Sequence, residues 1–113
     1  MKTNPVVEKS KKFALTIIAL YKSLAVERRE FVLSKQLLRS GTSIGANIRE
    51  AQRGQSKADF IAKMSIALKE ADESAYWLEL LHESGYIQDD EFKVLYSGCD
   101  ELIRLLVAIT KCR

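Results

Sequence analysis

The sequence predicts an all-α protein, with residues 1–113 forming one domain folded as an antiparallel up-down-up-down four-helix bundle. Proline occurs once and glycine five times in the chain, a composition that favours long helices over many short strands. Apolar residues recur at alternating steps of three and four in four separate segments, so each set lies on one face of a helix. Because short connections join the segments, neighbouring helices are expected to run antiparallel and to bury these faces together.

The first two segments differ in how strongly they favour a helix. The first helix is predicted to begin just after Pro5, which suits an early helical position, and to end at residues 26–30, where the apolar pattern breaks. Its buried face is predicted to contain Val6, Ser10, Phe13, Ile17, Leu20 and Leu24. The second helix is predicted from about Phe31 to Gln52, with a buried face of Ser34, Leu37, Gly41, Ile44, Ile48 and Ala51. Gly41 and Gly45 each cost ~1 kcal/mol of helix propensity relative to alanine, so we expect another backbone to approach closely there.

The third and fourth segments carry recognisable start signals. Ser56 is a good N-cap, and Asp59 follows it at the position that a capping box requires. The third helix is expected to end near Gly85, and its buried face consists of Phe60, Met64, Ala67, Ala71, Ser74, Leu78 and Leu81. The fourth helix is predicted to begin after Ile87, with a buried face of Phe92, Leu95, Cys99, Leu102, Leu106 and Ile109.

Several classes of function find no support in the sequence. The longest apolar stretch, residues 13–21, is about half the length that a helix needs to cross a bilayer, and the N-terminus lacks the pattern of a secretory signal. We therefore predict a cytoplasmic protein without membrane association. His82 is the single histidine, so the step from Glu79 to His82 has no second copy, as a di-iron bundle would require. We predict no metal site, cofactor or catalytic residue, and therefore no enzyme; only a site shared between subunits would alter this.

A polar stripe follows the second helix about a quarter-turn from its apolar face. Serine and asparagine are poor choices for a helix interior, and a surface helix would more often carry Glu, Lys or Gln. One interpretation is a solvated boundary with some hydrogen bonds between helices, and the other is a polar groove or a subunit contact. The stripe consists of Gln36, Ser40, Ser43 and Asn47, flanked by Arg39 and Glu50.

The third helix is apolar on its back as well as on its buried face. Steps of about 100° per residue place Ile66, Trp77 and Leu80 opposite the core face. A clustered apolar stripe with a tryptophan indicates a protein–protein contact. Alternatively, a loop or the N-terminal segment covers these side chains.

The net charge of +3 conceals a difference between the two halves of the chain. Residues 1–57 carry 12 Lys or Arg and 4 Asp or Glu, whereas residues 58–113 carry 6 and 11. The basic half is compatible with a nucleic-acid footprint, with the basic side of a head-to-tail oligomer, or with a plain solvated face. The candidate nucleic-acid contacts are Lys9, Lys12, Arg28, Arg29, Lys35, Arg39, Arg49 and Arg53.

Residues 38–51, Phe60, residues 64–71 and residues 76–81 resemble a bacterial four-helix-bundle family. That family is named for proteins encoded in intervening sequences of 23S ribosomal RNA genes. Its densest motif matches at Arg39, Ser40, Ser43, Ile44, Ala46, Asn47, Ile48 and Glu50, and the chain departs from it at Ala51, where many relatives carry glycine. The resemblance implies an up-down bundle that assembles as a homopentameric ring without an established activity. Gene location, and basic distant relatives that assist retroelement reverse transcriptases, imply a link to RNA.

The leading hypothesis is therefore a non-enzymatic, self-assembling interaction protein whose subunit contacts come from the second and third helices. The alternative is an RNA- or DNA-binding module that uses the basic surface of the first two helices.

Overall fold

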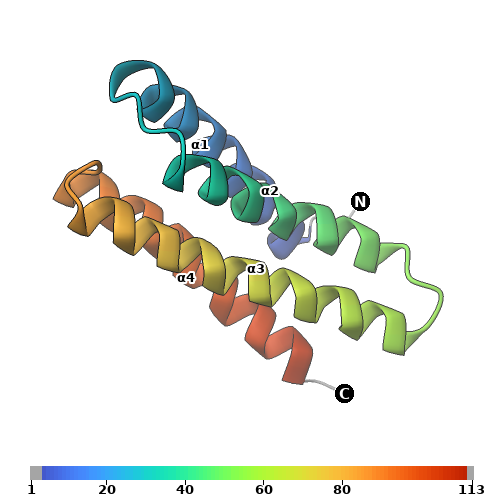
Figure 1. Cartoon of the computed structure of the whole chain (residues 1–113). Helices are drawn as coiled ribbons and strands as arrows, with labels where there is room; N and C mark the ends of the chain where they lie inside the picture. The colour runs from blue at the N-terminus through green and yellow to red at the C-terminus, as the bar shows by residue number, and fades with distance from the viewer. Residues whose placement is uncertain (1–3, 112–113) are drawn as a thin grey trace.

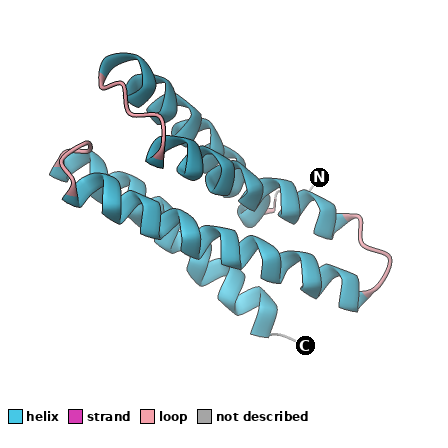
Figure 2. Ribbon diagram, in the orientation of Figure 1, coloured by secondary structure: helices cyan, strands magenta, loops and turns pink. Residues whose placement is uncertain are grey.

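Four long α-helices make up the computed structural model, which describes residues 4–111 (Figures 1 and 2). They are α1 (Pro5–Glu27), α2 (Leu33–Gln52), α3 (Lys57–Glu83) and α4 (Asp89–Lys111). Consecutive helices run antiparallel, and the α1–α2 hairpin lies on the α3–α4 hairpin (Figure 1). The described residues contain no strand, and the predicted all-α four-helix fold is confirmed.

The core lies where the predicted apolar faces meet. Every predicted face residue of α1 is buried, and the faces of α2 and α3 match closely, with Ser40 and Ala75 added. The prediction of full burial was wrong for Phe60, Phe92 and Ile109, which are half-buried and pack against the edge of the core. All three lie in terminal turns, where a facing helix covers less of the side chain.

The predicted helix boundaries are largely confirmed. Asp59 donates its backbone N–H to the Ser56 hydroxyl at 3.1 Å, so Ser56 caps α3. Gly85, two residues beyond α3, has a φ of +89°, a conformation that favours glycine. The prediction for α2 began two residues too early, because the structure of the preceding connection was not foreseen.

The connection between α1 and α2 contains an arginine whose backbone adopts the left-handed conformation. Arg29 has a φ of +56°, and the N–H groups of Arg28 and Glu30 both donate to the Leu24 carbonyl, at 3.2 and 3.0 Å. This is the pattern with which helices commonly end, although glycine normally occupies the left-handed position. The chain therefore turns sharply and brings Glu30 to the start of α2.

Glu30 caps α2 through its side chain. Its carboxylate accepts the N–H groups of Val32 and Leu33 at 3.0 Å and that of Ser34 at 2.7 Å, and only 8% of the residue is exposed. Burial, the largest single influence, raises the pKa of Glu30, but the hydrogen bonds together lower it below its ordinary value. The free N–H groups of the first helical turn thus bind a carboxylate, which the helix dipole also favours.

Replacing Glu30 with Gln should lower the free energy of unfolding by about 1 kcal/mol at neutral pH. Because folding lowers the pKa from its ordinary value of 4.5, the carboxylate stabilises the protein fully above that value. Its contribution is lost as the pH falls through the folded-state pKa. Urea unfolding of both proteins at neutral pH and at about pH 3 should show the difference shrinking at the acidic pH; a constant difference would contradict this account.

Helix α1 approaches both glycines of α2 closely, but at Gly41 the neighbour is the Ile17 side chain rather than the expected backbone. A Cβ added at Gly41 would lie 3.1 Å from Cγ2 of Ile17, and one at Gly45 would lie 3.3 Å from the Ser10 hydroxyl. Gly98 of α4 has more room, since a Cβ there would meet its nearest neighbour, Cδ1 of Phe13, at 3.8 Å. The α1–α2 pair therefore needs its glycines, whereas α4 can accept a side chain.

Two substitutions test this contrast. Gly98→Ala should raise the free energy of unfolding by about 0.5–1 kcal/mol, because alanine favours the helix and meets ordinary contacts. Gly41→Val should lower it by about 1–3 kcal/mol, because the added methyl groups displace Ile17. Urea unfolding provides both values, and a stabilised Gly41→Val protein would show that the approach is looser than described.

Candidate functional site

The polar residues of α2 meet α3 in a connected network. The hydroxyls of Ser40 and Ser74 lie 2.8 Å apart in the core. Beside this serine pair and nearer the surface, Arg39 forms ion pairs with Glu70, at 3.2 Å, and with Glu73. The Trp77 indole N–H also donates to Glu73, at 3.1 Å. Arg39 thus pairs with two carboxylates of α3. One of them, Glu73, also accepts the hydrogen bond from Trp77.

The predicted polar stripe divides into buried and accessible parts. Ser40 is fully buried, so it is corrected from a candidate surface residue to a core residue that hydrogen-bonds between helices. Ser43 and Asn47 are half-buried, and the Asn47 amide donates to the Ser43 carbonyl at 2.9 Å. Gln36 is exposed. Glu50 pairs with Lys63 of α3 at 2.8 Å.

The apolar residues predicted to lie on α3 opposite the core are not all on the back of the helix, because some lie where α3 meets α2. Trp77 is half-buried and packs against the edge of the core, so its predicted position opposite the core is corrected. Leu80 is half-buried and Ile66 is 41% exposed. Tyr76, which the sequence reasoning missed, is exposed, and its ring centre lies 5.3 Å from that of Trp77. Its spacing from the core positions gave no distinctive signal.

The two candidate surfaces therefore share one face of the bundle. The antiparallel register set by the Ser40–Ser74 and Glu50–Lys63 contacts brings Asn47 level with Ile66. We call this surface the α2–α3 face. It comprises Gln36, Arg39, Ser43 and Asn47 of α2 and Ile66, Glu70, Glu73, Trp77 and Leu80 of α3.

Three of the eight candidate nucleic-acid contacts are engaged within the chain. Arg39 is held by α3, and Lys9 pairs with Glu101 of α4 at 3.0 Å. Arg28 lies 5.0 Å from the centre of the Tyr86 ring and donates to the Tyr86 carbonyl at 3.4 Å. The others form no ion pair within residues 4–111: Lys12, Arg29, Lys35, Arg49 and Arg53.

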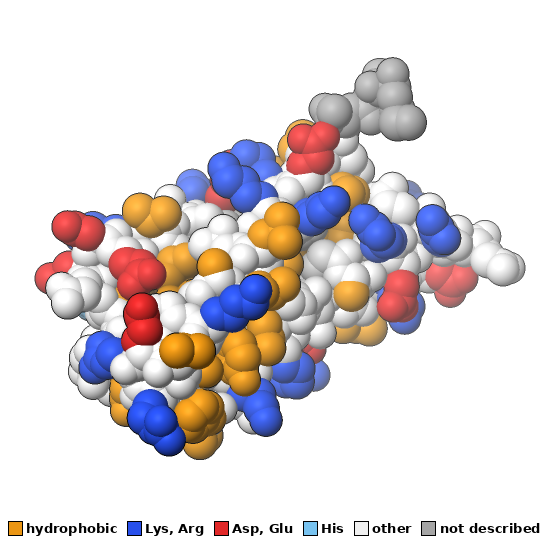
Figure 3. Space-filling model, turned by 90° about the horizontal axis from the view of Figure 1, so that it is seen from above, with side chains coloured by type: hydrophobic (Ala, Val, Ile, Leu, Met, Phe, Trp, Pro, Cys, Tyr) orange, Lys and Arg blue, Asp and Glu red, His pale blue; other side chains and the backbone are white. Residues whose placement is uncertain are grey.

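The view from above, onto the α1–α2 side, shows how these charges are distributed (Figure 3). Hydrophobic side chains gather in a band, and Lys and Arg side chains flank it rather than forming one continuous basic patch. Nucleic-acid binding stays a prediction.

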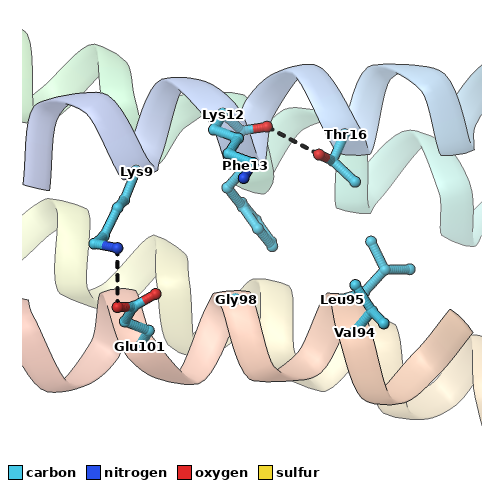
Figure 4. A pocket seen from close by; sticks show the side chains of 8 residues that line it. All are labelled: Lys9, Lys12, Phe13, Thr16, Val94, Leu95, Gly98 and Glu101. Atoms are coloured by element: carbon cyan, nitrogen blue, oxygen red, sulfur yellow. Dashed lines mark hydrogen bonds and ion pairs between the residues drawn. The ribbon is translucent and has the colours of Figure 1, made fainter. Parts of the chain in front are cut away.

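A small cleft separates α1 from α4, the pair of neighbouring helices with the least extensive contact (Figure 4). Phe13 points from α1 toward Gly98, and the Lys9–Glu101 ion pair bridges the two helices beside it. Both charged side chains are nearly half exposed, so the pair adds little stability.

The step from Glu79 to His82 does not converge on one point. Glu79 accepts a hydrogen bond from the Tyr96 hydroxyl at 2.9 Å. His82 contacts Asp89 at 2.6 Å and stacks on Phe92 with a ring separation of 4.1 Å. The hydrogen bond from His82, and then its charge, lower the pKa of Asp89. Residues 4–111 contain no group of three or more His, Cys, Asp or Glu side chains arranged to hold a metal ion.

Cys99 is the free cysteine of residues 4–111. It is fully buried, and its thiol lies 3.2 Å from the Ala71 carbonyl. Burial, helped by the charges of Asp72 and Asp100, raises its pKa to about 12. A thiol held protonated in this way is a core residue rather than a nucleophile. Within the described part of the chain, no helix is long and apolar enough to cross a membrane.

These features define a small four-helix-bundle protein whose distinctive surface lies where two helices meet. The family model for the 23S rRNA-intervening sequence protein matches residues 2–108, and the chain belongs to this family. The predicted resemblance is thereby confirmed.

A solved structure supports the same assignment. It is a protein of unknown function from the S23 ribosomal protein family of Bacteroides thetaiotaomicron, and it is 55% identical to this chain. The match covers 94% of this chain and 98% of that one, with a TM-score of 0.93. Among curated proteins, none matches this chain.

Proposed function

We propose that this chain is a non-enzymatic interaction protein of the cytoplasm that assembles with copies of itself through the α2–α3 face. The observation that carries the proposal is that the polar group of the Trp77 side chain already has a hydrogen-bond partner within the chain. Its indole N–H already has a partner in Glu73, and Glu73 has its own partner in Arg39. A second subunit can therefore cover the indole without leaving a buried polar group unpaired.

The rest of the α2–α3 face is also suited to burial. Glu70 and Glu73 share the charge of Arg39, and the α2 side contributes uncharged Gln36 and Asn47. Removing such groups from water costs less than removing unpaired charges. Tryptophan and arginine are also the residues that most often dominate binding energy at protein interfaces.

The family resemblance and the charge distribution support a ring of five subunits with head-to-tail contacts. Relatives of this type imply a homopentameric ring, so a mass five times that of the monomer is expected. The first half of the chain is basic and the second half acidic. Opposite charges favour a head-to-tail arrangement, in which each subunit offers different surfaces to its two neighbours.

Sedimentation at micromolar concentration tests this proposal. The wild-type protein should be an oligomer, and Ile66→Glu should raise the dissociation constant at least about tenfold, because it buries an unpaired charge at the contact. Val94→Glu is the matched control: Val94 is a 72% exposed apolar residue on α4, and its replacement should leave the mass unchanged. Circular dichroism of each variant verifies folding. A stable wild-type monomer would refute the proposal, as would an Ile66→Glu protein that assembles like the wild type.

Nucleic-acid binding by α1 and α2 is the alternative function. The five cations without ion partners in residues 4–111 support it. Such binding would weaken steeply with added salt, since released counterions drive it.

A further inference from the structure

A shallow groove runs along the outer side of the α1–α2 hairpin, next to the α2–α3 face but distinct from it. The hydrophobic band of Figure 3 lies on this side of the molecule. We call it the α1–α2 groove. It is lined by Val7, Ser10, Lys11 and Ala14 of α1 and by Thr42, Gly45, Ala46 and Arg49 of α2.

The floor of the groove offers no unsatisfied polar group. The Ser10 hydroxyl donates to the Val7 carbonyl at 2.9 Å, and the Thr42 hydroxyl donates to the Leu38 carbonyl at 2.7 Å. Gly45 has no side chain to fill the space above Ser10. What remains for a ligand on the floor is apolar surface and close access to the helix backbone.

The apolar surface continues beyond the groove along α1. Steps of three and four from Ala14 lead to Ile18 and Tyr21, and both are half-buried. From Val7 to Tyr21 the stripe extends about 21 Å, at ~1.5 Å per residue. That length accommodates about four turns of a partner helix.

The walls carry one cation each. Lys11 stands on α1 and Arg49 on α2, both are exposed, and neither forms an ion pair within residues 4–111. An apolar floor between two unpaired cations complements an apolar stripe between two carboxylates. A nucleic-acid backbone fits less well, because its phosphates would lie over a floor without hydrogen-bond donors.

We propose that the α1–α2 groove binds an amphipathic helix of another protein, one that carries Asp or Glu on both flanks of its apolar stripe. The apolar stripe lies on the groove floor, and the acidic flanks pair with Lys11 and Arg49. This is recognition of a helix in a groove, and it does not rest on the self-assembly proposed above.

A pair of synthetic peptides tests the proposal. One is a helical peptide of about 18 residues with Leu and Ala on its apolar face and Glu on both flanks, and the other has Lys at each Glu position. Fluorescence anisotropy should show the Glu peptide binding at least about tenfold more tightly, with affinity that falls as salt is added. Equal binding of the two peptides, or no binding of the Glu peptide, would overturn the proposal.

Charge reversal locates the site. The double variant Lys11→Glu with Arg49→Glu should invert the preference, so that the Lys peptide binds better. The matched control, Lys69→Glu with Lys93→Glu, makes the same change in net charge at exposed residues of α3 and α4, and should keep the original preference. If both double variants behave alike, only overall charge matters and the groove is not the site.

Blocking the groove provides a test that does not involve charge. Ala46→Trp places a large side chain in the groove, whereas Ala108→Trp alters an exposed alanine of α4. The first should abolish binding of the Glu peptide, and the second should not.

Two results would assign the groove to another occupant. If a single-stranded RNA of about 20 nucleotides displaces the Glu peptide from the wild type but binds the Lys11→Glu, Arg49→Glu variant weakly, the groove is a nucleic-acid site. If sedimentation shows that the same variant loses its oligomeric state, the groove is a contact between copies of this chain. Ile66→Glu should leave peptide binding intact, so failure of the self-assembly proposal is distinguishable from failure of this one.

Discussion

Two serine hydroxyls hold the halves of this bundle in register. Ser40 of α2 and Ser74 of α3 meet at 2.8 Å in a core that is mostly apolar. A slip of one turn between these helices would break this hydrogen bond and leave each hydroxyl only its contact with a carbonyl of its own helix, that of Leu37 for Ser40 and that of Glu70 for Ser74. The register they set places Arg39 against Glu70 and Glu73, and it brings the polar side of α2 alongside Ile66 and Trp77. The α2–α3 face is therefore a consequence of the core.

Most of the fold could be predicted because burial in a helical bundle is periodic in sequence. Steps of three and four identify the side chains that face inward, and every predicted face residue of α1 is buried. The same rule fails in the terminal turns, where Phe60, Phe92 and Ile109 point toward the core but only part of each side chain is covered. Periodicity specifies direction, whereas the extent of burial depends on where the neighbouring helices begin and end.

The candidate site was less predictable because its geometry depends on contacts between segments distant in the sequence. Spacing identified the polar stripe and the tryptophan separately, but only the register of α2 against α3 shows that Arg39, Glu73 and Trp77 form one network. Glu30 was missed for a related reason. A carboxylate two residues before an exposed valine has no helical spacing to mark it, and its capping role depends on the left-handed turn at Arg29. Polar interactions of this kind follow from backbone geometry rather than from residue type alone.

The placement of Trp77 also has a spectroscopic consequence. It is the single tryptophan of the chain, so the protein's indole fluorescence originates from the α2–α3 face alone. The half-buried ring is in contact with solvent, and its N–H donates to a carboxylate. Anything that covers this face removes water from the indole while its N–H bond persists, which shifts the emission to shorter wavelength. The unmodified protein thus carries a reporter at the surface where its role is proposed to lie.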